Sequence, residues 1–180
     1  MIRAVVIEPA EPVMTWDEVR HHVRLEADDE RQGYVMSLVA AAQGHIDGPD
    51  GWLERSIGVQ TLEARLDNFD CGSIRLPYPP AIRIGSVAYV DAAGDEKIVE
   101  PDTYELIGAS LVSAFGSAWP ATRLQRGGVR IQYVAGYEDV PPAIKLAVAL
   151  MVQGLFVGKS LDDALKGAAE ALLRPFQVYA

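Results

Sequence analysis

The strongest hydrophobic pattern in the chain lies at residues 129–157. Apolar and polar residues alternate over residues 129–135, which is the period of a half-buried β-strand. Pro142 then favours the start of a helix, because proline fits the first helical turn, where N–H groups have no partner in the helix. The pattern therefore predicts a strand, a short loop and a helix over residues 143–157.

That helix is apolar on nearly every side, since only Lys145 and Gln153 are polar. Such a helix must be covered all round. At roughly 15 residues it is shorter than the ~20 needed to cross a bilayer, so the cover must be protein. We infer that one face packs in the core of the chain and the other against another copy. The candidates for this subunit contact are Ile144, Val148, Met151 and Leu155.

Two helices are expected before the strands, within residues 15–56. Thr15 and Glu18 have capping-box spacing, in which each side chain satisfies a free backbone N–H of the other residue. Asp28 and Asp29 place negative charge where the second helix should begin, which its dipole favours. The buried stripe expected on the second helix consists of Tyr34, Val35, Leu38, Ala41, Ala42 and Ile46.

Residues 57–136 change to the alternating pattern of strands and predict a central β lobe of about six short antiparallel strands. The prolines at residues 76–80 must leave the sheet, because proline gives no ladder donor. The strands form one block between helices, without βαβ alternation, so the fold class is α+β. The expected order is an extended N-terminal arm at 1–14, one domain at 15–173 with its last helices at 141–173, and a C-terminal docking tail at 174–180.

Composition narrows the possible functions. The 180 residues are 49% hydrophobic and 23% charged, which is typical of a globular protein. The net charge of -9 argues against a sequence-reading nucleic-acid binder, which normally carries a basic face. The negative net charge remains compatible with a surface along which DNA moves without binding, because acidic groups repel phosphate. The N-terminus lacks the order of a signal peptide, so we expect synthesis in the cytoplasm.

Few residues suggest chemistry. His21 and His22 are adjacent, His45 is the only other histidine, and a zinc site needs three or four converging ligands. Cys71 has no histidine near it in the sequence to act as a base. We therefore expect no catalytic, cofactor or metal site, and a small enzyme is the least favoured class.

Three apolar features lie outside the expected helices and strands. Tyr78 and Trp119 stand in loops fixed by proline, where rigid interface anchors often occur. Packing of both rings on the domain's own sheet is an equally good interpretation. The tail carries Phe176 and Tyr179, which is unusual for a free terminus, so we expect it to dock on a partner or a neighbouring subunit.

Three blocks together form a pattern: IRLPYPPAIRIGSVAYVDAAG at residues 74–94, SAWPATR at 117–123 and VRIQYVAGYEDVPPAIKLAV at 129–148. With the Thr-capped first helix, this succession resembles the head–tail connector, or adaptor, family of long-tailed bacteriophages and gene transfer agents. The resemblance extends from about Trp16 to Leu173. One departure is GLFVGKS at residues 154–160, where the family usually has an aromatic and polar run ending in a basic residue.

The resemblance implies a non-enzymatic virion protein without a cofactor. It would form a ring of roughly twelve copies at the head–tail junction, assembled in the bacterial cytoplasm, between the portal protein and a tail-side connector or tail terminator protein. Closed rings need heterologous contacts, in which one patch meets a different patch of the next subunit. DNA would pass through the channel without sequence-specific binding, and no membrane would be involved.

Residues can be assigned to these roles as hypotheses. Subunit or partner interfaces would include Tyr78, Trp119, Ile144, Val148, Met151, Leu155, Phe176 and Tyr179, and the acidic lining of the channel would include Glu26, Asp28, Asp29 and Glu30. A different oligomeric head-completion or tail-terminator component is the main alternative. The source, phage or transfer particle, stays open.

Overall fold

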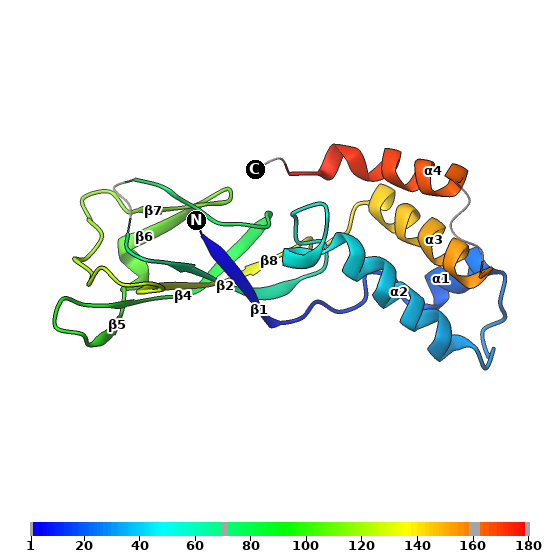
Figure 1. Ribbon diagram of the computed structural model, residues 1–180, viewed down its shortest axis with the longest axis horizontal. Coiled ribbons are helices and arrows are strands. Elements are labelled where there is room, and N and C mark those ends of the chain that lie inside the picture. The colour runs from blue at the N-terminus through cyan, green and yellow to red at the C-terminus, as the bar shows by residue number, and fades with distance from the viewer. Residues whose placement is uncertain (1, 70–71, 159–162, 179–180) are drawn as a thin grey trace. The chain divides into compact units, whose positions relative to one another are not determined.

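The structure is a computed structural model that describes residues 2–69, 72–158 and 163–178 (Figure 1). Helices and strands both contribute, and the paired strands are antiparallel, so the predicted α+β class is confirmed. The described elements are β1 (Arg3–Glu8), α1 (Trp16–Val23), α2 (Gln32–Ile46), β2 (Gln60–Leu66), β3 (Ile74–Arg75), β4 (Ala81–Val90), β5 (Glu96–Ile98), β6 (Tyr104–Ile107), β7 (Ser110–Ser113), β8 (Val129–Ala135), α3 (Pro142–Phe156) and α4 (Asp163–Leu173). Short 3₁₀ turns lie at Gly48–Asp50, Pro101–Thr103 and Arg174–Phe176.

The contacts divide the chain into two compact units. The β unit consists of residues 1–10 and 59–136, and the helical unit consists of residues 11–58 and 137–180. Each unit has its own hydrophobic core. Both units are therefore assembled from segments that are distant in the sequence.

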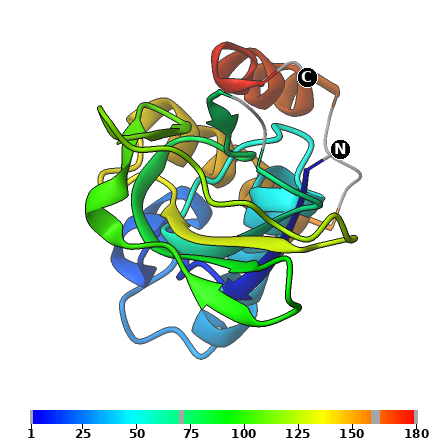
Figure 2. The same cartoon turned by 90° about the vertical axis from the view of Figure 1, so that its left-hand side faces the viewer.

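The β unit contains two antiparallel sheets (Figures 1 and 2). The larger sheet has the order β1-β2-β8-β4-β5, and the smaller has the order β3-β7-β6. β8 is the central strand of the larger sheet, and its alternate residues Val129, Ile131 and Tyr133 are fully buried, as the sequence pattern predicts. Their neighbours Arg130 and Gln132 are half-buried, so one face of this strand carries the core and the other carries polar side chains.

The first helix begins at the predicted capping box. The backbone N–H of Thr15 donates to Glu18 Oε2 at 2.8 Å, and the backbone N–H of Glu18 donates to Thr15 Oγ1 at 3.3 Å. Glu18 also accepts a bond from Lys145 Nζ at 2.8 Å, which ties α1 to α3. This hydrogen bond from Lys145, together with the one from the Thr15 backbone, lowers the pKa of Glu18.

A buried amide connects several segments of the helical unit. Gln43 on α2 accepts a hydrogen bond from the Val13 N–H at 3.0 Å and donates to the Glu11 carbonyl at 3.2 Å and to Asp47 Oδ2 at 3.0 Å. Asp47 also accepts the backbone N–H of Ile57 at 2.7 Å. This network holds the segment that precedes α1 and the segment that precedes β2 against the end of α2.

Three local predictions differ from the structure. Part of the expected N-terminal arm forms β1, which pairs with β2 in the order Arg3 opposite Arg65 to Glu8 opposite Thr61. In the buried stripe predicted on the second helix, Tyr34 is 52% exposed and Ala41 is exposed, whereas Val35, Ala42 and Ile46 are buried. Asp28 and Asp29 do not begin the second helix, because α2 starts at Gln32 and has no acidic residue in its first turn.

Candidate interaction sites

The apolar helix α3 is covered largely by its own chain. Ile144 and Val148 are fully buried, and Met151 is nearly so, in the core that α3 shares with α1, α2 and α4. These three side chains therefore leave no appreciable surface for a second subunit in this conformation. Leu155, the fourth residue predicted on this helix, is 37% exposed.

The exposed apolar side chains of α3 and its end are instead Leu146, Leu155 and Val157. Near the end of the helix, the half-buried ring of Phe156 lies 6.2 Å from the ring of Tyr34 on α2, which is itself exposed. The Arg31 guanidinium lies 5.7 Å from the Phe156 ring centre, a cation–π distance. This end of the helical unit thus carries an aromatic surface with the Arg31 guanidinium packed against it.

Trp119 packs within the β unit. Its ring is stacked on Phe69 with centroids 4.7 Å apart and an interplanar angle of 5°, and it lies 6.5 Å from Tyr104. The indole N–H donates to the Gly72 carbonyl at 3.4 Å. The ring is half-buried, so packing on the domain's own strands accounts for most of its apolar surface.

Tyr78 is also half-buried against the β core, with a backbone φ of 54°. Next to it in the sequence, the Pro77 carbonyl accepts a 2.6 Å hydrogen bond from the hydroxyl of Tyr133 on β8. Burial raises the pKa of Tyr133, so this hydroxyl stays protonated and keeps its role as a donor. This hydrogen bond therefore attaches the proline-containing loop at residues 76–80 to the central strand of the larger sheet.

The C-terminal tail contacts its own helical unit. Arg55 Nε donates to the Phe176 carbonyl at 2.7 Å, and the Val178 N–H donates to the Leu53 carbonyl at 3.0 Å. Phe176 is half-buried against the helical core. The apolar character of the tail as far as Val178 thus has a partner within the chain, whereas Tyr179 lies outside the described residues.

The four predicted channel acids lie together in the loop between α1 and α2. Glu26, Asp28 and Glu30 are exposed. Asp29 is partly covered, because Arg31 donates to both of its carboxylate oxygens at 2.9 and 2.7 Å. These hydrogen bonds lower the pKa of Asp29 to about 2. The loop therefore presents three exposed carboxylates beside the ion pair of Asp29 and Arg31.

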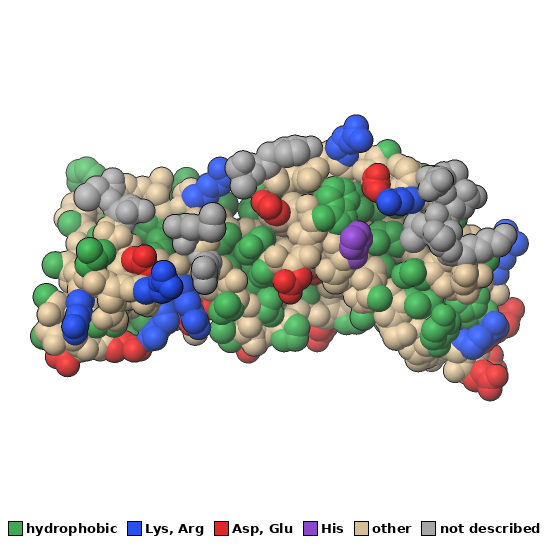
Figure 3. All heavy atoms as spheres, viewed as in Figure 1, with side chains coloured by type: hydrophobic (Ala, Val, Ile, Leu, Met, Phe, Trp, Pro, Cys, Tyr) green, Lys and Arg blue, Asp and Glu red, His purple; other side chains and the backbone are tan. Residues whose placement is uncertain are grey.

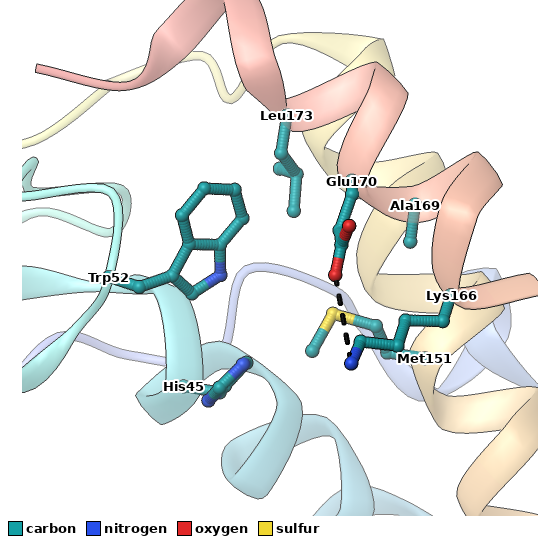
Figure 4. Close-up of a pocket in the computed structure, with 7 residues that line it drawn as sticks. All are labelled: His45, Trp52, Met151, Lys166, Ala169, Glu170 and Leu173. Atoms are coloured by element: carbon teal, nitrogen blue, oxygen red, sulfur yellow. Dashed lines mark ion pairs between the residues drawn. The ribbon is translucent and has the colours of Figure 1, made fainter. Parts of the chain in front are cut away.

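A small pocket opens in the helical unit, and sequence reasoning missed it (Figure 4). Its volume is about 100 Å³. Trp52, Met151, Ala169 and Leu173 supply its apolar walls. The polar lining consists of His45 and of an ion pair between Lys166 and Glu170 with 3.9 Å between nitrogen and oxygen. This lining suits an apolar group better than a reacting polar one.

Within residues 2–69, 72–158 and 163–178, no group of three or more His, Cys, Asp or Glu side chains could hold a metal ion. None of the described helices is long and apolar enough to cross a membrane. Cys71 lies outside the described residues.

Several exposed apolar side chains were not singled out from the sequence. Phe115 is fully exposed just after β7, and Leu124 is exposed in the same loop. On β1, the consecutive residues Val5, Val6 and Ile7 are all exposed. Figure 3 shows hydrophobic side chains reaching the surface among acidic and basic ones. A run of three apolar residues has no alternation, so the sequence alone did not distinguish an exposed edge strand from an arm.

No family model matches the chain, and no curated protein matches it. Solved structures do resemble it over nearly its whole length. One is described as the virion of a native gene transfer agent (GTA) particle, with a TM-score of 0.78 and 21% identity over 98% of this chain and 96% of the other. A second, the neck of an empty GTA particle computed with C6 symmetry, has a TM-score of 0.74 and 24% identity over 100% and 96%. A third, the neck of a native GTA particle computed with C12 symmetry, has a TM-score of 0.66 and 23% identity over 100% and 96%. At these identities, the comparison shows that the chain shares the fold of those particle proteins.

Proposed function

We propose that this protein is a structural component of the head–tail junction of a phage-like particle or gene transfer agent. In this role it forms a ring between the portal protein and the tail and prolongs the DNA channel. The observation that carries the proposal is the shared fold over both units, with TM-scores of 0.74 and 0.66 to proteins of GTA necks. The sequence blocks that resemble the connector family give independent support.

The ring is supported by the symmetry of those necks and by the surfaces of this chain. Neck structures computed with C6 and C12 symmetry contain the proteins that share its fold. Exposed apolar groups occur on different elements, such as Leu155 on α3 and Phe115 after β7. A closed ring needs two different complementary patches on each subunit, and a chain with separate apolar patches meets that requirement.

The predicted interface residues contribute unequally to this proposal. Leu155 offers exposed apolar surface, and Tyr78, Trp119 and Phe176 each retain part of theirs. Ile144, Val148 and Met151 support the ring only indirectly, by holding α3 in place.

The channel lining is proposed to include the acidic loop between α1 and α2. Its exposed carboxylates at Glu26, Asp28 and Glu30 would repel the phosphates of passing DNA. The charge-reversed variant Glu26→Lys/Asp28→Lys/Glu30→Lys should then slow DNA release from assembled particles. Unchanged release from particles that carry this variant would exclude these residues from the lining.

The proposed ring is tested by the mass of the purified protein in solution. Native mass spectrometry should be recorded over a wide range of concentration, alone and with purified portal protein. A ring of about a dozen copies in either condition is expected from closed cyclic symmetry. A strict monomer in every condition contradicts the proposal.

Partner binding separates the proposed role from its main alternative. A connector ring binds the portal protein, whereas a tail terminator binds the tail tube. Pull-down with each purified partner distinguishes the two roles, and binding to the tail tube alone would favour the terminator.

A further inference from the structure

Among the described residues, the larger sheet of the β unit has two edges without a further strand. β1 forms one end of the sheet and pairs only with β2 among the described residues (Figures 1 and 2). At the other end, β5 is three residues long and pairs with β4 only from Ala88 to Val90. Residues 81–86 of β4 pair with β8 on one side, and the described part of the chain offers them no strand on the other. Each open edge exposes backbone donors and acceptors that can pair with a strand.

β1 lacks most of the features that normally protect an edge strand. Its central residues Val5, Val6 and Ile7 are 38%, 41% and 46% exposed, and all three are β-branched. The strand contains no proline and no lysine, the residues that commonly block edge pairing. The protective features that are present lie toward its ends: Arg3 and Glu8 are charged, and the register with β2 breaks between Val6 and Glu8. The remaining stretch combines exposed apolar side chains with high strand propensity, as strand-pairing segments do.

The opposite edge matches β1 in length and also carries apolar side chains, and its register with β8 breaks between Ala81 and Arg83 and between Ile84 and Ser86. β1 spans six residues, and the stretch of β4 without a second partner also spans six, from Ala81 to Ser86. Ile82 and Ile84 on this stretch are half-buried and retain exposed apolar surface. Each chain therefore carries two compatible edges at opposite ends of one sheet.

We propose that β1 of one subunit pairs with residues 81–86 of β4 in a second copy of the chain, so that one sheet continues across the subunit boundary. The contact is heterologous, because the two edges are different surfaces, and repeated contacts of this kind close into a ring when the rotation allows it. Backbone pairing sets the direction of the contact, and the apolar side chains of both edges add buried area. This inference rests on the ring proposed above and assigns it an interface.

The test compares two lysine variants of equal chemistry. Val6→Lys places a charge on the open edge, and Val59→Lys places it on a valine of similar exposure, 44%, outside any strand. Assembly is followed by native mass spectrometry over a concentration series, with portal protein present where the wild type requires it. We expect Val6→Lys to weaken assembly by about tenfold or more and Val59→Lys to leave it unchanged. Circular dichroism confirms that both variants are folded.

Hydrogen exchange of the wild-type protein gives a second readout that requires no substitution. Backbone amides in residues 3–8 and 81–86 should exchange more slowly in the assembled protein than in the dilute subunit, because pairing protects them. Assembly with unchanged exchange in both segments, or with Val6→Lys equal to wild type, would overturn the edge contact and leave the ring intact. Protection of residues 3–8 alone, with a dimeric mass, would show β1 pairing with β1 and would also overturn it. A wild type that never assembles would overturn both proposals.

Discussion

Replacing Gln43 by leucine should destabilise the helical unit strongly, although leucine has nearly the same size. Gln43 is 7% exposed, and its side chain makes three hydrogen bonds. The variant removes all three and leaves the N–H of Val13, itself a buried residue, without its acceptor. Roughly 0.5–1 kcal/mol for each of the bonds to Glu11 and Asp47, and 1–3 kcal/mol for the buried N–H of Val13, give about 3 kcal/mol as the central value of the total.

In a chain of 180 residues, this loss corresponds to a fall in Tm of roughly 6–12 °C. Thermal unfolding followed by circular dichroism measures it. Gln32→Leu is the matched control, because Gln32 lies at the start of the same helix and is exposed, so its substitution should change stability by less than about 0.5 kcal/mol. Equal Tm values for the two variants would refute the argument that the buried amide holds these segments together.

Three further predictions concern single contacts. Tyr133→Phe should cost about 1–3 kcal/mol in urea unfolding, because the Pro77 carbonyl loses its donor; an unchanged midpoint would show that this carbonyl finds another partner. Lys145→Met should be less stable than wild type at pH 7. The pKa of Glu18 is lowered in the folded state, so the difference in unfolding free energy between the two proteins should be fully present above pH 4.5, the ordinary pKa of Glu18. It should vanish as the pH falls through the lower pKa of the folded state, and a difference independent of pH would contradict the pairing. Ile144→Ala should cost about 2–5 kcal/mol at every protein concentration, since its burial is within one chain, whereas a loss seen only in the oligomer would place this residue at a subunit contact.

Local patterns in the sequence predicted those elements that local interactions determine. The capping box at Thr15 lies within a single turn, and the alternation in β8 follows directly from one buried face, so both were predicted correctly. Asp29 was misplaced because its carboxylate bonds to the neighbouring Arg31 instead of starting a helix. A charge near a possible helix start fits both arrangements, and the sequence does not separate them.

The candidate interfaces were harder to predict, because burial depends on contacts between distant segments. An apolar helix such as α3 must be covered, but the pattern does not say whether α1, α2 and α4 or another subunit supplies the cover. Trp119 posed the same problem, since stacking on Phe69 depends on a loop fifty residues earlier in the chain. Sequence periodicity identified buried residues such as Val35, Ala42 and Ile46, was wrong at Tyr34 and Ala41, and left open which segments cover the buried ones.

The division into two units also affects how the chain is made. The β unit needs residues 1–10 and 59–136, so all of it has been synthesised before α3 exists. The core of the helical unit requires Ile144 and its neighbours on α3, which follow the whole β unit. During translation, the apolar stripe of α2 therefore lacks its contacts with α3 while more than ninety residues are added between Ile46 and Pro142. Ribosome-bound chains that end before α3 should for this reason be the ones that bind chaperones, and longer chains should be released from them.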